Sequence, residues 1–192
     1  MNKDNIIAFF NSIASSWDDE AIYKDEIIAS ILNYAEVEDG KKVLDVACGT
    51  GFLFENYYKR NVQSLTGIDI SVEMLKICSE KFPDAKLICA DAEDFYFQDT
   101  FDTIVIHNAY PHFCNPIKLF KNLTSFLTDG GRITVSHDMS REELNGFHQK
   151  RASDISSTLP EADELSEIMN QYVEVDKIIS NNRMYLVSGK KK

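Results

Sequence analysis

The chain has 192 residues, of which 44% are hydrophobic, and it carries a formal net charge of -11. This length and hydrophobic content predict one folded domain with a single sizeable core rather than a disordered chain. A surface this acidic repels nucleic acid and anionic membranes, so neither is an expected partner. No apolar run approaches the ~20 residues that span a bilayer, and the first ten residues lack the pattern of a signal peptide.

The cysteines carry information about the compartment. They form no C-x-x-C pair and no framework typical of small disulfide-rich domains, so free thiols in a reducing cytoplasm are expected. The short basic stretch at residues 190–192 is interpreted as a solvated end, and nothing in the sequence indicates an oligomeric state. The cysteines are Cys48, Cys78, Cys89 and Cys114.

Hydrophobic periodicity divides the chain into two parts. Residues 1–39 are expected to form a helical cap, because apolar residues recur at helical spacing there, whereas residues 40–192 alternate strands and helices. This alternation predicts an α/β, doubly wound, mainly parallel sheet with helices on both faces. Strands are predicted at 42–47, 65–70, 86–90, 102–107 and 132–136, helices from about 52 and at 71–82, 115–127, 140–152 and 161–171, and a terminal antiparallel hairpin at 173–179 and 184–187.

Short local signals set several of these boundaries. Ser71 stands where a helix N-cap is expected, and Ser140 with Glu143 forms a plausible capping box for the next-to-last helix. The sequence Asp-Gly-Gly at 129–131 predicts a turn before the fifth strand, and the two asparagines at 181–182 predict the turn of the hairpin.

The segment from Val43 to Gly51 is the most informative in the chain. It predicts a strand, a tight glycine turn and a helix, and in open α/β sheets ligands bind beyond the carboxyl ends of the strands. A dinucleotide loop would need G-x-G-x-x-G, but Ala47 and Phe52 occupy two of the glycine positions. A phosphate loop with Gly-Lys-Ser/Thr is also absent. Asp45 instead suits a ligand with positive charge, such as an ammonium or a sulfonium.

This stretch resembles motif I of the class I S-adenosylmethionine-dependent methyltransferases, written D/E-x-G-x-G-x-G, with Ala47 at the position of the first glycine. The resemblance extends from about Gly40 to the terminal hairpin. It implies a Rossmann-like sheet, S-adenosyl-L-methionine as the cofactor, and cofactor contacts from the loop itself. The implied loop contacts are Asp45, Ala47, Cys48, Gly49 and Gly51.

Two further acids follow the second and third predicted strands. Asp69 lies 18 residues after Gly51, where an acid can accept both hydroxyls of a ribose, although a strand-end acid can also be a simple helix cap. The resemblance implies that Asp91 and the backbone of Ala92 bind the adenine edge. It also implies that Ile70 and Met74 sandwich the adenine ring, although Met74 could equally be core filler.

The resemblance covers two other regions. Residues 101–109 match the fourth motif of the family, whose strand end lines the methionine part of the cofactor, and residues 129–133 match the turn and strand that follow it. The segment with Phe9, Phe10, Ser16, Trp17 and Asp18 resembles the cap of small-molecule methyltransferases. Trp17, the single tryptophan, is expected either to contact the cofactor or to be an ordinary core residue.

All four histidines fall late in the chain, and three of them follow the fourth and fifth strands. One hypothesis makes His107, His112 or His137 a general base for the acceptor, with His107 also beside the cofactor. A second makes them metal ligands together with Asp138, Cys114 or His148, although no local metal-binding spacing supports it. A third treats them as polar lining of a pocket. We assign no metal.

The expected function is methyl transfer to a small-molecule acceptor. A sulfonium is already activated, so positioning and electrostatics can supply most of the catalysis, and no catalytic triad is required. The alternative is a sensor or regulatory protein that binds S-adenosylmethionine on the same fold without turnover. A nicotinamide oxidoreductase is disfavoured by the missing glycines.

Overall fold

A computed structural model describes residues 1–20, 24–151 and 154–192. It contains a seven-stranded sheet in the order β3-β2-β1-β4-β5-β7-β6, in which β1 to β5 are parallel and β7 is antiparallel to both of its neighbours. The strands are β1 (Lys42–Val46), β2 (Ser64–Asp69), β3 (Lys86–Cys89), β4 (Phe101–His107), β5 (Leu127–His137), β6 (Val173–Ser180) and β7 (Tyr185–Lys191).

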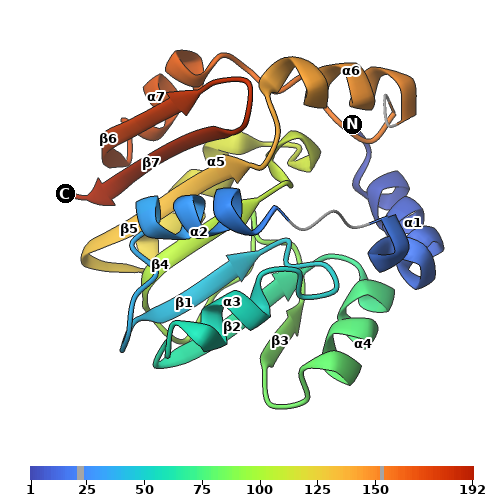
Figure 1. The fold of residues 1–192 in the computed structure, drawn as a ribbon, viewed down its shortest axis with the longest axis horizontal. Coiled ribbons are helices and arrows are strands. Elements are labelled where there is room, and N and C mark those ends of the chain that lie inside the picture. The colour runs from blue at the N-terminus through green and yellow to red at the C-terminus, as the bar shows by residue number, and fades with distance from the viewer. Residues whose placement is uncertain (21–23, 152–153) are drawn as a thin grey trace.

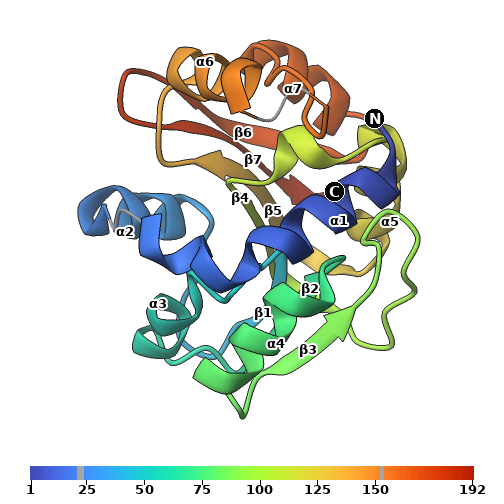
Figure 2. The same ribbon diagram turned by 90° about the vertical axis from the view of Figure 1, so that its right-hand side faces the viewer.

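Helices cover both faces of the sheet, as Figure 2 shows for α2 and α3 on one side and α5 on the other. The α-helices are α1 (Lys3–Ile13), α2 (Asp25–Tyr34), α3 (Phe54–Lys59), α4 (Val72–Lys81), α5 (Pro116–Ser125), α6 (Arg141–Arg151) and α7 (Ala162–Met169), with 3-10 turns η1 (Ala14–Glu20) and η2 (Tyr110–His112). The predicted fold class is therefore confirmed. No helix in the described part of the chain is long and apolar enough to cross a membrane.

Two apolar clusters lie on the two faces of the sheet. Along β1, Val43 packs with residues of α2, α3 and α4, whereas Leu44 and Val46 pack with residues of α5 and α7. The side chains of a strand alternate between faces, so a central parallel strand that is covered on both sides must be apolar throughout. This explains why the central strands read as continuous hydrophobic runs in the sequence.

Several element boundaries differ from the sequence expectations. Residues 129–131 do not form a separate turn before the fifth strand but lie within β5, where the pairing with β4 shifts register between Phe101 and Thr103. Gly130 has a φ of 71°, which lets the strand make this excursion. The helix expected to start near Phe52 begins at Phe54, and the expected helix end at about Ala152 lies outside the described residues.

The basic C-terminal stretch is not a solvated end. Lys190 and Lys191 belong to β7, where the Lys190 ammonium pairs with Glu36 at 3.0 Å and the Lys191 ammonium donates to the Leu127 carbonyl at 2.7 Å. The two caps that local signals predicted do form: Ser71 accepts from the Met74 N–H, and Ser140 and Glu143 exchange hydrogen bonds.

Arg132 fastens the C-terminal hairpin to the parallel sheet. Its buried guanidinium donates to both carboxylate oxygens of Asp176 at 2.6 and 2.7 Å, to Glu36 at 2.9 Å and to the Ser188 hydroxyl at 3.0 Å. A bidentate guanidinium–carboxylate pair is geometrically specific and stronger than a neutral hydrogen bond. The network therefore joins β5, β6, β7 and the segment after α2.

We expect Arg132→Met to lower the free energy of unfolding by about 1.5–3 kcal/mol, the contribution typical of hydrogen bonds to charged groups, because the partly exposed carboxylates of Glu36 and Asp176 can regain water. Urea denaturation would measure the change. Lys59→Met is the matched control, since Lys59 pairs with Glu55 at the exposed surface of α3 and such pairs contribute less than about 1 kcal/mol. Equal effects of the two substitutions would contradict a structural role for the Arg132 network.

Candidate active site

A cavity of about 890 Å³ opens at the carboxyl edge of the sheet. In Figure 1, α1 lies beyond the arrowheads of β1 and β2, so the N-terminal segment closes the cavity on that side. Its walls come from the ends of β1, β2 and β4, the segment after β3, helix α1 and residues near α6. Parallel strands place their carboxyl ends at one edge, and this is the usual position of ligand sites in such sheets.

The glycine loop after β1 contains three residues in the left-handed region, namely Ala47, Gly49 and Gly51 with φ of 56°, 54° and 85°. A Cβ on Gly49 would meet no atom within 4 Å, whereas one on Gly51 would lie 2.8 Å from the Phe82 ring. Gly49 therefore leaves the cavity open to a ligand, and Gly51 permits close packing of the loop on α4. Ala47 and Gly49 line the cavity, but Gly51 lines a different pocket.

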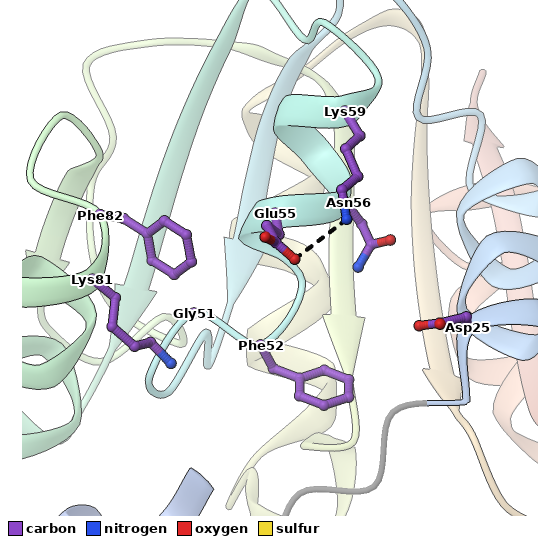
Figure 3. A pocket seen from close by; sticks show the side chains of 8 residues that line it. All are labelled: Asp25, Gly51, Phe52, Glu55, Asn56, Lys59, Lys81 and Phe82. Carbon is purple, nitrogen blue, oxygen red and sulfur yellow. Dashed lines mark hydrogen bonds and ion pairs between the residues drawn. The ribbon is translucent and has the colours of Figure 1, made fainter.

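That smaller pocket lies on the other side of the loop, as Figure 3 shows. Lys81 and Phe82 reach it from the end of α4, Asp25 from α2, and the ion pair of Lys59 with Glu55 from α3. Its lining carries charges of both signs and its volume is about 210 Å³, so we assign it no ligand.

Asp69 holds the glycine loop in place. One carboxylate oxygen accepts from the Gly49 N–H and the other from the Ser71 N–H, both at 2.8 Å. Burial raises the pKa of Asp69, while these backbone hydrogen bonds oppose the rise. Each oxygen keeps a further lone pair, and the residue lines the cavity, so its capacity to accept from a ligand remains.

Asp45 is a second buried carboxyl group on the cavity wall. Burial raises its pKa well above the usual range, and the nearby negative charge of Asp69 raises it further. No lysine or arginine of the described residues forms an ion pair with it. A ligand cation in the cavity would supply the charge partner that the chain itself does not provide.

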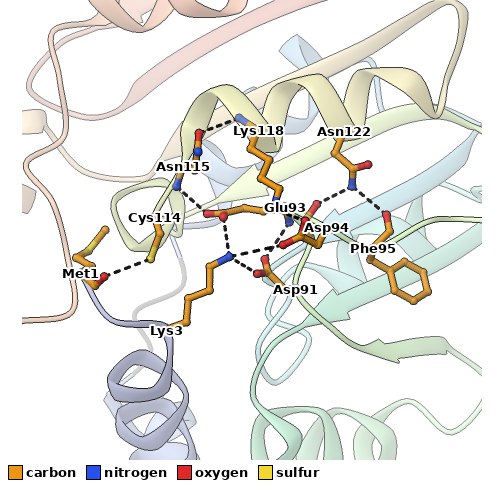
Figure 4. A network of polar contacts seen from close by, with 11 residues as sticks. Met1, Lys3, Asp91, Glu93, Asp94, Phe95, Cys114, Asn115, Lys118 and Asn122 are labelled. Atoms are coloured by element: carbon orange, nitrogen blue, oxygen red, sulfur yellow. Dashed lines mark hydrogen bonds and ion pairs between the residues drawn. The ribbon is translucent and has the colours of Figure 1, made fainter.

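Asp91 takes part in the ionic network drawn in Figure 4. The Lys3 ammonium on α1 forms ion pairs with Asp91 and, at 2.7 Å, with Glu93. The other Asp91 oxygen accepts from the Glu93 N–H at 2.9 Å. Glu93 in turn accepts from the Asn115 N–H at 2.8 Å. The carboxylate that the resemblance assigns to adenine thus also anchors the cap. A carboxylate offers about four acceptor sites and these contacts use two, so Asp91 can still accept from a ligand.

The cap is fastened at a second place by Asp18 of η1. One carboxylate oxygen of Asp18 accepts from the Thr50 hydroxyl at 2.6 Å, and the other accepts from the Lys81 ammonium at 2.8 Å. The acid of the cap therefore contacts the glycine loop and α4 directly. Trp17 beside it is 42% exposed and lines the cavity, so it is not a core residue.

The other predicted cofactor contacts also lie on the cavity wall. Ile70 and Met74 line it together, and Met74 is at the same time almost fully buried, so its two expected roles are compatible. Ala92 lines it beside Asp91. Cys48 lines it as a free thiol, close to a glycine of β2: a Cβ at Gly67 would lie 2.8 Å from its sulfur.

His107 lies on the cavity wall and contacts an aromatic residue that follows the glycine loop. It ends β4, lines the cavity and stacks on the Phe52 ring at 5.9 Å between centroids. Its Nδ1 lies 3.0 Å from the Ser136 hydroxyl, and its buried Nε2 has no hydrogen-bond partner among the described residues. Burial lowers its pKa to about 4, against the opposing charge of Asp138, so the ring is neutral at pH 7.

His112 and His148 form a second pair on the wall, with ring centroids 5.2 Å apart. The Nδ1–H of His112 donates to the Ile155 carbonyl at 2.9 Å, which leaves Nε2 as an acceptor in the neutral ring. Burial lowers the pKa of both residues, to about 4 for His148. Both are uncharged at neutral pH.

His137 does not fit the base hypothesis. Its side chain is fully buried and is absent from the cavity wall, and neither ring nitrogen has a hydrogen-bond partner among the described residues. Burial, with the neighbouring histidines, lowers its pKa well below the usual value. The metal hypothesis has no geometric support either, since no group of three or more His, Cys, Asp or Glu side chains in the described residues is arranged to hold a metal ion.

Sequence reasoning gave no role to Phe52 or Asn108. Phe52 stacks on His107, and Asn108 adopts a left-handed φ of 53° directly after β4. Asn108 and Asp138 form two hydrogen bonds of 3.2 Å that join the ends of β4 and β5. A non-glycine residue with positive φ is uncommon and often marks a functional turn, but this backbone state leaves little trace in the sequence.

Residues 43–131 match the family model described as a methyltransferase domain. The matched span runs from β1 through the glycine loop, Asp69 and Asp91 to β5. This part of the chain is therefore a methyltransferase domain, and it is similar to the domains of S-adenosylmethionine-dependent methyltransferases.

Curated relatives agree with this family. The chain is 27% identical over 139 residues to a malonyl-[acyl-carrier protein] O-methyltransferase of Marinomonas sp., covering 70% of this chain and 52% of the relative. It is 26% identical over 161 residues to the ubiquinone/menaquinone biosynthesis C-methyltransferase UbiE of Campylobacter jejuni, covering 76% and 68%. The chain thus spans between about half and two thirds of the length of these methyltransferases.

A solved structure shares the whole fold. The N-methyltransferase NodS from Bradyrhizobium japonicum, in complex with S-adenosyl-L-homocysteine, matches with a TM-score of 0.77 at 14% identity and covers 98% of this chain and 99% of its own. The methyltransferase fold therefore includes the N-terminal cap and the C-terminal hairpin, which lie outside the family-model match.

Proposed function

We propose that this methyltransferase transfers the methyl group of S-adenosyl-L-methionine to a small-molecule acceptor. The observation that carries the proposal is the pair of buried carboxyl groups, Asp45 and Asp69, beside an open glycine loop on the wall of one large cavity. S-adenosyl-L-methionine carries a sulfonium and an ammonium group, which supply the positive charge that these carboxyl groups lack. Its ribose hydroxyls can donate hydrogen bonds to them. It supplies an electrophilic methyl group when bound.

The residues of the cavity fit this cofactor. We assign the ribose hydroxyls to Asp69, the adenine amino group to Asp91, and the adenine faces to Ile70 and Met74. Asp45 supplies negative charge near the positively charged part of the cofactor. Gly49 keeps the approach free of a side chain, and the cap with Trp17 and Phe10 excludes water.

On the acceptor side, the main task of the chain is to hold the acceptor in line with the methyl group. Because the activated methyl group needs only an aligned nucleophile, a group that removes a proton from the acceptor is the chief remaining requirement. We assign this task to Nε2 of His107, which is buried, neutral and unpartnered among the described residues. Ser136 orients the ring through Nδ1.

We also propose that the protein acts in the cytoplasm, without nucleic acid or membrane as a partner. The net charge of -11 disfavours polyanionic surfaces. All four cysteines are free thiols, which suits a reducing compartment.

Thermal shifts with S-adenosylmethionine, S-adenosylhomocysteine and NAD would test the cofactor. We expect both sulfur compounds to raise the melting temperature and NAD to leave it unchanged, because a ligand that binds only the folded state stabilises it. A shift with NAD alone would overturn the proposal. Tight binding without turnover on any acceptor would favour the sensor alternative.

The affinity for S-adenosylmethionine should rise as the pH increases through the raised pKa of Asp45. Below that pKa Asp45 is protonated in the free protein, whereas the bound cation favours its ionised form. Binding should therefore release a proton below the raised pKa and none above it. Calorimetry in buffers of different ionisation enthalpy measures this release.

Asp45→Asn should remove both the pH dependence and the proton release. Glu55→Gln is the control, because Glu55 is an exposed carboxylate just after the loop. An unchanged proton release in Asp45→Asn would assign the titration to another group and contradict the role given to Asp45.

A further inference from the structure

The cavity extends well beyond the residues assigned to the cofactor. Its volume of about 890 Å³ lies near the upper end of the ~300–1,000 Å³ typical of small-molecule sites. On the side of α1 and α6, the wall consists of apolar and aromatic side chains with histidines between them. The side chains that carry the argument are Phe10, Phe113, Leu144, Phe147, His112 and His148.

Aromatic contacts define this region. Phe10 is arranged edge-to-face with Trp17 at 5.8 Å and with His112 at 5.0 Å between ring centroids, and His112 makes a tilted contact with His148. Such edge-to-face contacts continue naturally onto a further ring, because the edge of one π-system attracts the face of the next. The wall thus favours a flat aromatic ligand over a flexible aliphatic one.

The charges of the region disfavour an anionic ligand. The two lysines of the cavity wall are already engaged: Lys3 pairs with Asp91 and Glu93, and the Lys24 ammonium donates to the Asp138 carbonyl at 2.6 Å. The histidines are held neutral by burial. A carboxylate or phosphate ester would therefore lose its hydration without gaining a cation.

A cationic acceptor is also disfavoured. Asp138 is the acid of this side, and the Lys24 ammonium, which donates to the Asp138 backbone carbonyl at 2.6 Å, already places a positive charge beside it. Among the described residues of the wall, two buried ring nitrogens have no hydrogen-bond partner, Nε2 of His107 and Nδ1 of His148. Of these, Nε2 of His107 lies at the end of β4, where the methyl group is expected, and can serve a ligand hydroxyl as proton acceptor.

We infer, on the basis of the proposed function, that the acceptor is an uncharged aromatic molecule with a phenol-type hydroxyl, which packs against Phe10 and Phe147 and directs its hydroxyl to His107. In the transfer step the acceptor oxygen forms a bond to the methyl carbon while the carbon–sulfur bond breaks. The pair of electrons of that bond stays on sulfur, which becomes a neutral thioether. The hydroxyl proton passes to Nε2 of His107 and then to solvent.

Four probes of similar size would test the acceptor chemistry by calorimetry on protein saturated with S-adenosylhomocysteine. They are 2-naphthol, 2-naphthoate, 1-naphthylmethylamine and 2-decalinol, which differ in charge or in aromaticity. We expect 2-naphthol to bind at least tenfold more tightly than each of the others. Equal or tighter binding of a charged probe would overturn the neutral acceptor, and equal binding of 2-decalinol would overturn the aromatic one.

The order of titrations separates this inference from the proposed function. If S-adenosylhomocysteine itself fails to bind, the proposed function fails. If it binds but 2-naphthol does not, only the acceptor inference fails. With S-adenosylmethionine present, mass spectrometry should detect 2-naphthol with one added methyl group, and an absence of that product despite binding would contradict the transfer step.

Phe10→Ala should weaken 2-naphthol binding by more than fivefold, and by a larger factor than it weakens the binding of S-adenosylhomocysteine. Phe10→Leu, which keeps most of the volume, should lose less. Ile117→Ala is the matched control, because Ile117 is an exposed apolar residue of α5 outside the cavity wall. The affinity for S-adenosylhomocysteine reports the folding of each variant, and equal 2-naphthol binding in all of them would contradict the assigned ring site.

Discussion

Replacing Asp69 with alanine is expected to weaken the binding of S-adenosylhomocysteine by more than tenfold. The carboxylate does two things at once: it accepts from the Gly49 N–H, which shapes the loop, and it presents its remaining lone pairs to the cavity. Hydrogen bonds to a charged acceptor each contribute about 1.5–3 kcal/mol, and tenfold in affinity corresponds to about 1.4 kcal/mol. Calorimetric titration of the ligand measures the loss.

Asp102 provides the matched control for this experiment. It also bridges two donors, since its oxygens accept from the Lys42 N–H and the Thr128 hydroxyl at 2.9 Å each. It lies at the start of β4, however, at the edge of the sheet opposite the cavity. Asp102→Ala should lower stability without changing the affinity for the ligand, and an unchanged affinity in Asp69→Ala would remove Asp69 from the ribose site.

His107→Gln is expected to reduce kcat by about 10²–10⁴, the range typical for the loss of a general base. Glutamine has a similar length and can still contact Ser136, but its amide cannot take a proton at neutral pH. The affinity for S-adenosylhomocysteine should stay within a factor of about three, because the lost interaction is made with the acceptor. Steady-state kinetics with the identified acceptor, together with calorimetry, separates the two effects.

Ser136→Ala tests whether the ring must be oriented. Ser136 is fully buried and contacts Nδ1 of His107 at 3.0 Å, so it acts through the histidine rather than on the acceptor. We expect a smaller loss in kcat than in His107→Gln, with the pH dependence of the rate displaced because the hydrogen bond to the ring is gone.

A wild-type rate in His107→Gln would contradict the role of His107 as a base. The cavity would then act on the acceptor by positioning alone.

The local signals in the sequence predicted much of the fold. The continuous apolar strands, the glycine turn after β1 and the caps at Ser71 and Ser140 depend on residues close together in the chain, where backbone preference and hydrogen-bonding chemistry decide. The prediction of a separate turn at residues 129–131 was wrong because it also depended on a local signal alone. A local Asp-Gly-Gly pattern indicates that the backbone bends, but pairing with β4 decided that this bend stays within a strand.

What the sequence indicated by itself was the ligand class. Ala47 and Phe52 exclude a dinucleotide loop, Asp45 suits a positively charged ligand, and Asp69 and Asp91 fall where an adenosine needs partners. Only the tertiary structure decided which histidines line the cavity. His107 and His137 end the neighbouring strands β4 and β5, but His107 lies on the cavity wall and His137 is fully buried away from it. The tertiary structure also decided that Lys3 of the cap reaches Asp91, 88 residues away. Contacts over such separations depend on how the elements pack, and no pattern along the chain records that.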